Sequence, residues 1–286
     1  MFTSSQSSAC PACGASDADW LCSNQFCGKT WHLARCSRCG QHYTDPLPSS
    51  EEIAGFYAGE YHSGLRTNAS AEQRFRHKFE RYASFIHRFV RKGGRTLDIG
   101  CATGLLPKLL QDAGYRSEGL EFNSESVKWG CEHYGVPLRV GSIDDPGLTP
   151  ASYDLISFTD VLEHFGAPLQ ALTRSRELLV DRGWLFVTFP DILSIESRYY
   201  QCLAQFLRRD WLWFTSHIPK HVWEFTPATA RSLFAKAGFE VVAFQRAHEL
   251  ISAPGRLRSL TFPPRLLLLF GDRYGTRMEF MLRKSK

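Results

Sequence analysis

The stretch Arg95-Thr96-Leu97-Asp98-Ile99-Gly100-Cys101-Ala102-Thr103-Gly104-Leu105-Leu106 contains the pattern that decides the fold. It is typical of a short buried strand, a glycine-rich turn and the first turn of a helix. Gly100 and Gly104 carry no Cβ, so the backbone can turn tightly and approach a ligand closely. Leucines at 105, 106, 109 and 110 give the helix an apolar face. This pattern predicts a cradle for a small ligand.

The composition limits the class of protein. A chain of 286 residues with 43% hydrophobic side chains can bury one sizeable core and a small appendage. Its formal net charge of +5 permits an anionic substrate or weak nucleic-acid contact but requires neither. Residues 1–8 lack the apolar core of a secretory signal, and the apolar run at 266–270 is too short to span a bilayer. These features predict a cytoplasmic protein with no membrane span.

Six of the nine cysteines precede residue 40. Cys10 and Cys13 form one Cys-x-x-Cys knuckle, and Cys36 and Cys39 form a second one after a segment of hairpin length. Two such knuckles can place four thiolates around Zn²⁺, and four thiolates leave no open coordination position. We therefore expect a structural zinc site. A pair of disulfides is disfavoured in a cytosolic chain, and a redox dithiol lacks the surrounding βαβ pattern.

Other side chains between the knuckles could compete for the metal. They are Cys22, Cys27 and His32. The symmetry of the paired knuckles favours the four knuckle cysteines, so Cys22 and Cys27 are expected to be buried or free thiols.

Residues 46–92 are expected to form a linker and N-terminal helices. Between 71 and 90, aromatic and aliphatic side chains recur at helical spacing. Basic side chains interleave with them: Arg74, Arg76, Lys78, Arg81, Arg88 and Arg91. One interpretation is a stripe that binds nucleic acid. The commoner one is a solvated face opposite an apolar face.

Strands and helices alternate after the cradle. Strands are expected at 95–99, 116–121, 138–140, 153–158 and 184–189, with a helix at 169–179 that ends before Gly183. This alternation predicts a doubly wound, mostly parallel α/β sheet, whose ligands bind beyond the carboxyl ends of the strands. Acidic residues stand at four successive strand ends: Asp98, Glu121, Asp144 and Asp160.

These acidic residues discriminate between ligands. A dinucleotide site uses Gly-x-Gly-x-x-Gly, whose N–H groups face a pyrophosphate. Here Gly100 and Gly104 are separated by three residues, and Asp98 stands two residues before the first glycine. A fixed negative charge repels phosphate and suits an ammonium group, while Glu121 can accept hydrogen bonds from both ribose hydroxyls. A ribose, an ammonium group and no phosphate describe S-adenosylmethionine.

Leu97–Gly104, Glu121 and Asp160-Val161-Leu162-Glu163-His164 together resemble the class I S-adenosylmethionine-dependent methyltransferases, most closely the branch that includes quinone-biosynthesis methyltransferases. Lys220-His221-Val222-Trp223-Glu224-Phe225-Thr226-Pro227 resembles the same branch, and the paired knuckles resemble its subset with a zinc ribbon.

The resemblance implies a seven-stranded Rossmann-like sheet whose last strand is antiparallel. It puts the sixth strand at 240–244 and the seventh at 277–283. The implied domains are a zinc ribbon at 1–45 and a methyltransferase domain at 93–286, with an acceptor-binding insertion at about 191–226.

The resemblance also implies roles for individual residues. Asp98, Gly100 and Gly104 would hold the methionine part of the cofactor, and Glu121 would hold the ribose. The adenine would lie beside Ser142, Ile143 and Asp144, while Thr159 and Asp160 close the pocket. Cys101 and Phe122 complete the implied cofactor-binding set. Ala102 stands where the family often has glycine, a departure that would loosen cofactor binding if this position needs a positive φ.

Transfer to a hydroxyl or an acidic carbon needs a base, and histidine is suited to this near neutral pH. His164 follows the fourth strand and His221 lies in the insertion, so both are candidate catalytic residues. A structural histidine bonded to a loop carbonyl is the alternative for each.

The insertion is rich in aromatic residues, which favour an apolar acceptor pocket, a lid that excludes water, or a second small core. They are Tyr199, Tyr200, Trp211, Trp213, Phe214, Trp223 and Phe225. The stretch 256–270 mixes arginine with leucine, which is compatible with a peripheral membrane contact or with core packing.

The sequence therefore predicts a methyltransferase that acts at O, C or N of a small-molecule acceptor, apolar or aromatic in character. One alternative is a zinc-ribbon RNA methyltransferase, which would bind RNA with strong salt dependence. Another is a non-catalytic binding protein that keeps the fold. The intact cradle favours an enzyme, one basic helix is weak support for nucleic acid, and the oligomeric state is left open.

Overall fold

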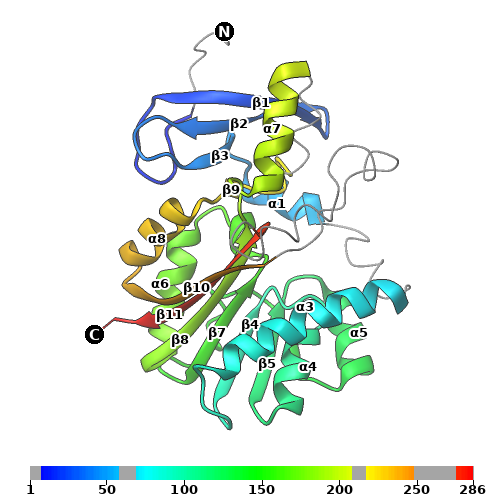
Figure 1. Cartoon of the computed structure of the whole chain (residues 1–286). Coiled ribbons are helices and arrows are strands. Elements are labelled where there is room, and N and C mark those ends of the chain that lie inside the picture. The colour runs from blue at the N-terminus through cyan, green and yellow to red at the C-terminus, as the bar shows by residue number, and fades with distance from the viewer. Residues whose placement is uncertain (1–7, 58–68, 208–216, 248–274, 286) are drawn as a thin grey trace.

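The computed structural model describes residues 8–57, 69–207, 217–247 and 275–285 (Figure 1). A small antiparallel sheet near the N-terminus lies against one end of a larger α/β unit (Figure 1). Trp211, Trp213, Phe214 and the stretch 256–270 lie outside the described residues.

The larger unit is a seven-stranded sheet of order β10-β11-β8-β7-β4-β5-β6. Strands β4 to β8 pair in parallel, and β11 runs antiparallel to both β8 and β10. Its strands are β4 (Arg95–Ile99), β5 (Arg116–Glu121), β6 (Leu138–Val140), β7 (Tyr153–Thr159), β8 (Leu179–Pro190), β10 (Phe239–Ala247) and β11 (Arg277–Lys284). The predicted Rossmann-like sheet with an antiparallel last strand is therefore confirmed.

Helices cover both faces of this sheet (Figure 1). They are α3 (Ala69–His87), α4 (Leu105–Asp112), α5 (Ser124–Tyr134), α6 (Pro168–Leu178) and α8 (Pro227–Lys236). Strand β8 shows how the layers form, because successive side chains of a strand point to opposite faces. Val187 packs in the core that includes α6 and α8, whereas Phe186 packs in the core under α3 and α4.

The end of α6 differs from the prediction. Helix α6 ends at Leu178, and β8 begins at once with Leu179, which pairs with Tyr153. Strand pairing then resumes between Trp184 and Leu155, so residues 180–183 form a bulge that contains Gly183. Leu178 and Leu179 are both fully buried. The extended backbone of Leu179 and its pairing with Tyr153, rather than the glycine, therefore mark where the helix stops.

The smaller sheet has the order β1-β2-β3-β9. Its strands are β1 (Ala18–Phe26), β2 (Lys29–Cys36), β3 (His42–Asp45) and β9 (Trp223–Glu224). Strand β9 comes from the predicted insertion and pairs with β3, so Tyr43 lies opposite Trp223. Helix α7 (Ile195–Leu207) packs on the same unit, since Ala204 shares a core with Leu33. The N-terminal strands and the insertion thus build one structural unit.

Several aromatic side chains of the insertion belong to the protein core. Tyr200, Trp223 and Phe225 are buried, and the Phe225 ring stacks on Phe189 of β8 with ring centroids 4.5 Å apart. Tyr199 is exposed. Among the described aromatic residues of this segment, core packing is therefore the main role.

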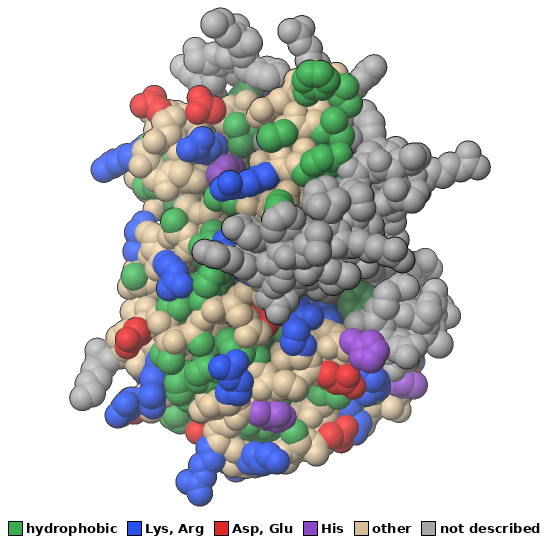
Figure 2. All heavy atoms as spheres, viewed as in Figure 1, with side chains coloured by type: hydrophobic (Ala, Val, Ile, Leu, Met, Phe, Trp, Pro, Cys, Tyr) green, Lys and Arg blue, Asp and Glu red, His purple; other side chains and the backbone are tan. Residues whose placement is uncertain are grey.

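Figure 2 shows one face of the molecule. Basic and acidic side chains are interspersed over its lower part, and hydrophobic side chains gather near the outer end of α7, where Phe206 and Leu207 are exposed. In the part of the chain that the structure describes, none of the helices combines the length and the apolar character needed to cross a membrane.

Candidate active site

The glycine-rich turn between β4 and α4 is held against the neighbouring strand. The N–H groups of Gly100 and Cys101 both donate to the carbonyl of Leu120, at 2.8 and 3.1 Å. Gly100 has φ +68°, and a Cβ placed on it would lie 2.4 Å from Cγ2 of Val161. Both the backbone angle and the close packing therefore require glycine at this position.

Glu121 ends β5 beside this turn, and backbone groups fix its carboxylate. Oε2 accepts the N–H of Ala102 at 3.0 Å, and Oε1 accepts the N–H of Asn123 at 3.0 Å. Ala102 has φ +50°, so the departure from glycine lies at a position with a positive φ. Such a conformation strains an alanine modestly, and the hydrogen bond to Glu121 helps to hold it.

A cavity of about 310 Å³ opens at the carboxyl ends of β4, β5 and β7. The residues that line it are Ser50, Ile53, Gly100, Glu121, Phe122, Asp160, Val161, His164, Phe165 and Gly166. Five predicted site residues therefore meet at one cavity. The contribution of α1 (Ser50–Tyr57), which supplies Ile53, was not predicted from the sequence. Only the capping pair of Ser49 and Glu52 marks this helix in the sequence.

Asp98 lies beneath the cavity wall rather than among its lining residues. Its Oδ1 accepts the hydroxyl of Ser157 at 2.6 Å, and the side chain is almost fully buried. Burial raises the pKa of the Asp98 carboxyl to about 7, because the hydrogen bond from Ser157 only partly offsets desolvation and the charge of Glu121 adds to it. A nearby cation would favour its ionised form.

The remaining predicted cofactor residues lie in the turn after β4, at the end of β7 and after β6. The Cys101 side chain packs against Gly119, Gly104 packs against Leu138, and Thr159 is buried. After β6, Ile143 is fully buried in the core, whereas Asp144 is exposed and donates its N–H to the hydroxyl of Ser142. None of these six residues belongs to the described lining of the cavity.

Asp160 is the centre of a cluster of charges that was not predicted from the sequence. Its carboxylate pairs with Lys78 of α3 and Arg277 of β11, and it accepts the Thr188 hydroxyl at 3.1 Å. Burial alone would raise the pKa of Asp160, but Arg277 and Lys78 outweigh burial and lower this pKa to about 2. The sequence does contain a signal that Lys78 is buried, because it is the one basic residue in the apolar helix face formed by residues 75, 79, 82 and 86.

Two further basic residues in the described part of this segment make structural contacts. Arg81 pairs with the fully buried Glu279 of β11, with nitrogen and oxygen 2.9 Å apart. Arg88, which directly follows the end of α3, lies over the ring of Phe85. The described contacts of this helix therefore favour the structural interpretation over a nucleic-acid face.

His164 and His221 come together although 57 positions separate them in the chain. Their ring centroids are 4.9 Å apart, and both lie beside Glu163. His164 is in η1 (Leu162–His164), and its Nδ1 lies 2.8 Å from the carbonyl oxygen of Lys220. Nδ1 of His221 lies 3.0 Å from Oε1 of Glu224, and the His221 carbonyl accepts the Thr44 hydroxyl.

Burial controls protonation in this cluster. It lowers the pKa of His164 to about 4 and that of His221 well below its usual range, so both imidazoles are neutral at pH 7. Burial also raises the pKa of Glu163 to about 8, with Asp160 adding to the effect, and raises the pKa of Glu224 well above its usual range. Neutral imidazoles can accept a proton or bind a metal ion.

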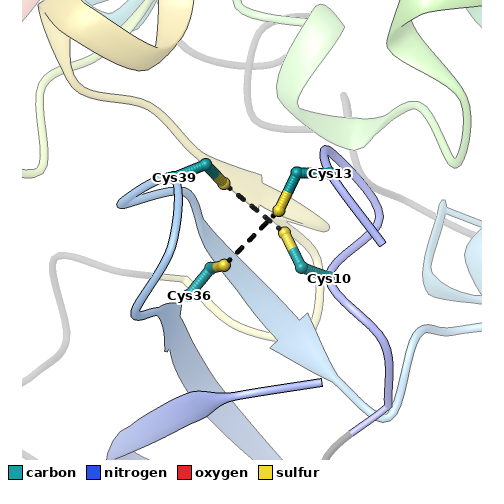
Figure 3. A group of neighbouring side chains, drawn as sticks. All are labelled: Cys10, Cys13, Cys36 and Cys39. Atoms are coloured by element: carbon teal, nitrogen blue, oxygen red, sulfur yellow. Dashed lines mark hydrogen bonds between the residues drawn. The ribbon is translucent and has the colours of Figure 1, made fainter. Parts of the chain in front are cut away.

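The four knuckle cysteines converge at the edge of the small sheet, with their sulfur atoms pointing toward one another (Figure 3). Sγ of Cys10 lies 3.7 Å from Sγ of Cys39, and Sγ of Cys13 lies 3.6 Å from Sγ of Cys36. A disulfide needs about 2.05 Å, whereas four sulfurs at about 2.3 Å from one Zn²⁺ stand about 3.8 Å apart. The arrangement therefore fits a tetrahedral metal site.

Cys22, Cys27 and His32 are not part of this cluster. Cys22 is buried, Cys27 is exposed, and the ring of His32 stacks on Trp20 while its Nδ1 lies 2.8 Å from the Ser23 hydroxyl.

Comparison with known proteins gives consistent matches. The family described as "Methyltransferase domain" matches residues 72–243, which is more than half of the chain. A "Ubiquinone biosynthesis O-methyltransferase" of Paraburkholderia phymatum is 25% identical over 197 residues, covering 66% of this chain and 77% of that protein. The protein of the same name from Burkholderia vietnamiensis is 27% identical over 100 residues, and this match spans only 43% of its length and 33% of this chain.

Solved structures share the fold. The 1,6-didemethyltoxoflavin-N1-methyltransferase of Burkholderia thailandensis, solved with bound 1,6-didemethyltoxoflavin and S-adenosylhomocysteine, has a TM-score of 0.57 at 14% identity. The match covers 92% of this chain and 99% of that chain.

Proposed function

The chain belongs to the methyltransferase domain family, and from this premise we propose that it methylates a small-molecule acceptor with S-adenosylmethionine as donor. It is an S-adenosylmethionine-dependent methyltransferase, and its resemblance to the class I enzymes is confirmed. The class of acceptor and the roles of the site residues are the proposal. The observation that carries it is the cavity whose lining brings Gly100 and Glu121 together with His164.

Glu121 is proposed to hold the cofactor ribose. Two backbone N–H groups fix its carboxylate at the cavity edge. Each carboxylate oxygen keeps a second lone pair, which can accept a hydrogen bond from a ribose hydroxyl. Gly100 gives close approach to the backbone, and Phe122 offers an apolar wall. Asp98 beneath the wall supplies negative charge for the ammonium group. When bound, the cofactor supplies an electrophilic methyl group on a sulfonium.

The acceptor is proposed to be an apolar or aromatic molecule that carries a hydroxyl group. Ile53, Val161 and Phe165 form apolar walls next to His164, whose neutral imidazole is suited to a reacting hydroxyl. The names of the curated relatives, O-methyltransferases of ubiquinone biosynthesis, support a small acceptor and transfer to oxygen. The task of this chain is then to orient the hydroxyl in line with the methyl group and to ease loss of its proton.

Zn²⁺ is proposed to occupy the cysteine cluster in a structural role. Burial raises the pKa of the Cys10 thiol to about 12, while a hydrogen bond from the N–H of Ala15 lowers that of Cys13 to about 7. A bound Zn²⁺ would hold all four as thiolates and would join the N-terminal segment to the end of β2.

The test is transfer of a labelled methyl group into cell extract that has been separated into protein, RNA, lipid and small polar fractions. We expect label in the lipid or small-molecule fraction. Label in RNA, together with RNA binding that weakens steeply with salt, would support the RNA methyltransferase instead. Calorimetry that detects no binding of S-adenosylmethionine would support the non-catalytic alternative.

A further inference from the structure

We propose that a second cavity, at the junction of the small sheet and the larger unit, binds a small aromatic carboxylate. This junction cavity has a volume of about 270 Å³ and lies between the cysteine knuckles, the start of α6 and one face of α8. The site does not depend on the proposed function, because neither Glu121 nor His164 belongs to its described lining.

The walls of the junction cavity are largely apolar. Side chains from distant parts of the chain meet there: Ala12, Leu169, Trp223, Phe225 and Leu233. Trp223 and Phe225 are buried, and their rings lie nearly parallel, with an interplanar angle of 7° and centroids 6.1 Å apart. Walls of flat rings and aliphatic groups suit a ligand whose body is a planar ring.

The charge of the lining selects an anion. Lys236 is the only lysine or arginine in the described lining, and neither aspartate nor glutamate is present there. Its Nζ donates to the carbonyl oxygen of Ala12 at 3.0 Å, which holds the ammonium group next to another lining residue. Cys39 also lines the junction cavity, but its sulfur turns toward the other knuckle cysteines, so it belongs to the proposed zinc site (Figure 3). An anionic group on the ligand can therefore pair with Lys236.

The start of α6 adds partial positive charge. Residues 166–170 line the junction cavity, and they include the N-cap Ala167 and Pro168 of the first turn. Alanine has no side-chain oxygen with which to cap the helix, and proline has no N–H to donate. The N-terminus of a helix attracts anions, because its first N–H groups lack partners within the helix. A carboxylate bound there would take the place of a side-chain cap.

Trp223 gives an independent indication of a ligand. The residue is only 4% exposed, and among the described residues its Nε1–H finds no acceptor. An indole N–H can only donate, and a buried donor without a partner is costly, so a carboxylate oxygen would satisfy it. The small sheet fixes this wall, since β9 holds Trp223 opposite Tyr43 and Gln41 donates to the carbonyl oxygen of Glu224 at 3.0 Å.

The experiment is a calorimetric titration of the full chain with trans-cinnamate, a planar carboxylate, and with cinnamamide, its neutral counterpart. We expect cinnamate to bind with a Kd below about 1 mM. Cinnamamide should bind about 10-fold more weakly, because it loses a hydrogen bond between charged groups. Absence of measurable cinnamate binding, or equal affinities for the acid and the amide, would overturn the proposal on the wild-type chain.

Variants locate the bound acid, which matters because Gly166 lines both cavities. Trp223→Phe keeps an aromatic ring but removes the N–H donor, so it should weaken cinnamate binding about 10-fold. Lys236→Met removes the ammonium group of an exposed side chain and should weaken binding about 2- to 5-fold.

Matched control variants are available for both changes. Trp184→Phe alters a tryptophan outside the described lining of the junction cavity. Lys284→Met alters a lysine whose Nζ likewise donates to a backbone carbonyl, that of Leu179 at 2.9 Å. Both controls should bind cinnamate with the affinity of the wild type.

The indole N–H of Trp223 supplies a direct readout. In a nitrogen–proton correlation spectrum of the full chain, the indole signal that disappears in Trp223→Phe belongs to Trp223. Cinnamate should shift this signal downfield, as a hydrogen bond to a carboxylate does, and should leave the Trp184 signal in place. An unshifted Trp223 signal, or wild-type affinity in both Trp223→Phe and Lys236→Met, would place the acid elsewhere and overturn the assignment.

Discussion

Lys78 on α3 forms an ion pair with Asp160, which lies 82 positions later at the carboxyl end of β7. Arg277 of β11 pairs with the same carboxylate. The cavity edge is thus held by three elements that are far apart in the sequence. These charges keep Asp160 ionised and connect α3 to β11, the last strand.

Replacing Lys78 with methionine should destabilise the protein by about 3 kcal/mol. The change removes one of the two cations that pair with the buried Asp160 carboxylate, and breaking a buried ion pair lowers stability. Because Arg277 still pairs with Asp160, we expect a loss at the lower end of the range for buried ion pairs. Urea unfolding measures the effect. Lys108→Met is the control, because Lys108 pairs with Asp112 in a more exposed position, where the loss should stay below about 1 kcal/mol. Equal effects would contradict a stabilising role for the Lys78 pair.

Asp98 should make the stability of the protein fall as pH rises. Its pKa is about 7 in the folded chain, compared with 3.8 for an unperturbed carboxyl, so between these pH values the folded state holds a proton that the unfolded state releases. The stabilisation is complete below about pH 4 and is lost as pH rises through about 7, with a slope of at most about 1.4 kcal/mol per pH unit. The difference in unfolding free energy between wild type and Asp98→Asn isolates this effect. A difference that does not change with pH would show that Asp98 titrates normally.

Glu121→Gln should weaken S-adenosylmethionine binding about 10- to 100-fold. The loss corresponds to the hydrogen bonds that a charged acceptor makes with the ribose, about 1.5–3 kcal/mol. Calorimetry measures it. Glu118→Gln is the control. Glu118 lies on the same strand but pairs with Arg95 toward the opposite end of the sheet, so the affinity of this variant for S-adenosylmethionine should match that of the wild type. Unchanged affinity in Glu121→Gln would remove this residue from the cofactor site.

Gly100→Ala should reduce cofactor binding more than backbone strain alone can explain. The added Cβ would lie 2.4 Å from Val161, which has to move into the cavity wall. Gly114→Ala is the control, because Gly114 has φ +91° but no atom within 4 Å of an added Cβ. The control should lose about 1 kcal/mol of stability and keep its affinity for the cofactor. Equal affinity in both variants would exclude a close approach at Gly100.

Cys10→Ser should lower the zinc content by one ion per chain and destabilise the small sheet. Elemental analysis measures the zinc, and limited proteolysis measures the sheet. Cys27→Ser changes an exposed thiol outside the cluster and should keep the zinc. S-adenosylmethionine binding should survive in both variants, because the cysteine cluster is separate from the lining of the candidate active-site cavity. Zinc retained in Cys10→Ser would point to a different ligand set.

Local patterns explain which features the sequence could predict. The glycine turn, the strand that ends at Glu121 and the paired knuckles each occupy a short stretch, where spacing reports geometry directly. The sequence pattern places the end of α6 one residue late, because Gly183 resembles a helix end whereas the pairing of Leu179 with Tyr153 in the sheet ends the helix earlier. The contribution of α1 to the cavity lining could not be predicted, since no local sequence pattern shows which surface Ile53 covers.

By itself the sequence determined the parallel sheet, the cradle with its strand-end acids and the set of four cysteines, because periodicity and spacing along the chain encode them. Only the tertiary structure decided the partners of Asp160, the pairing of β9 with β3 and the meeting of His164 with His221. These contacts join segments many residues apart, and their formation depends on how the layers pack. Side-chain spacing is a local quantity, whereas the chemistry of this site arises where distant strand ends and loops converge.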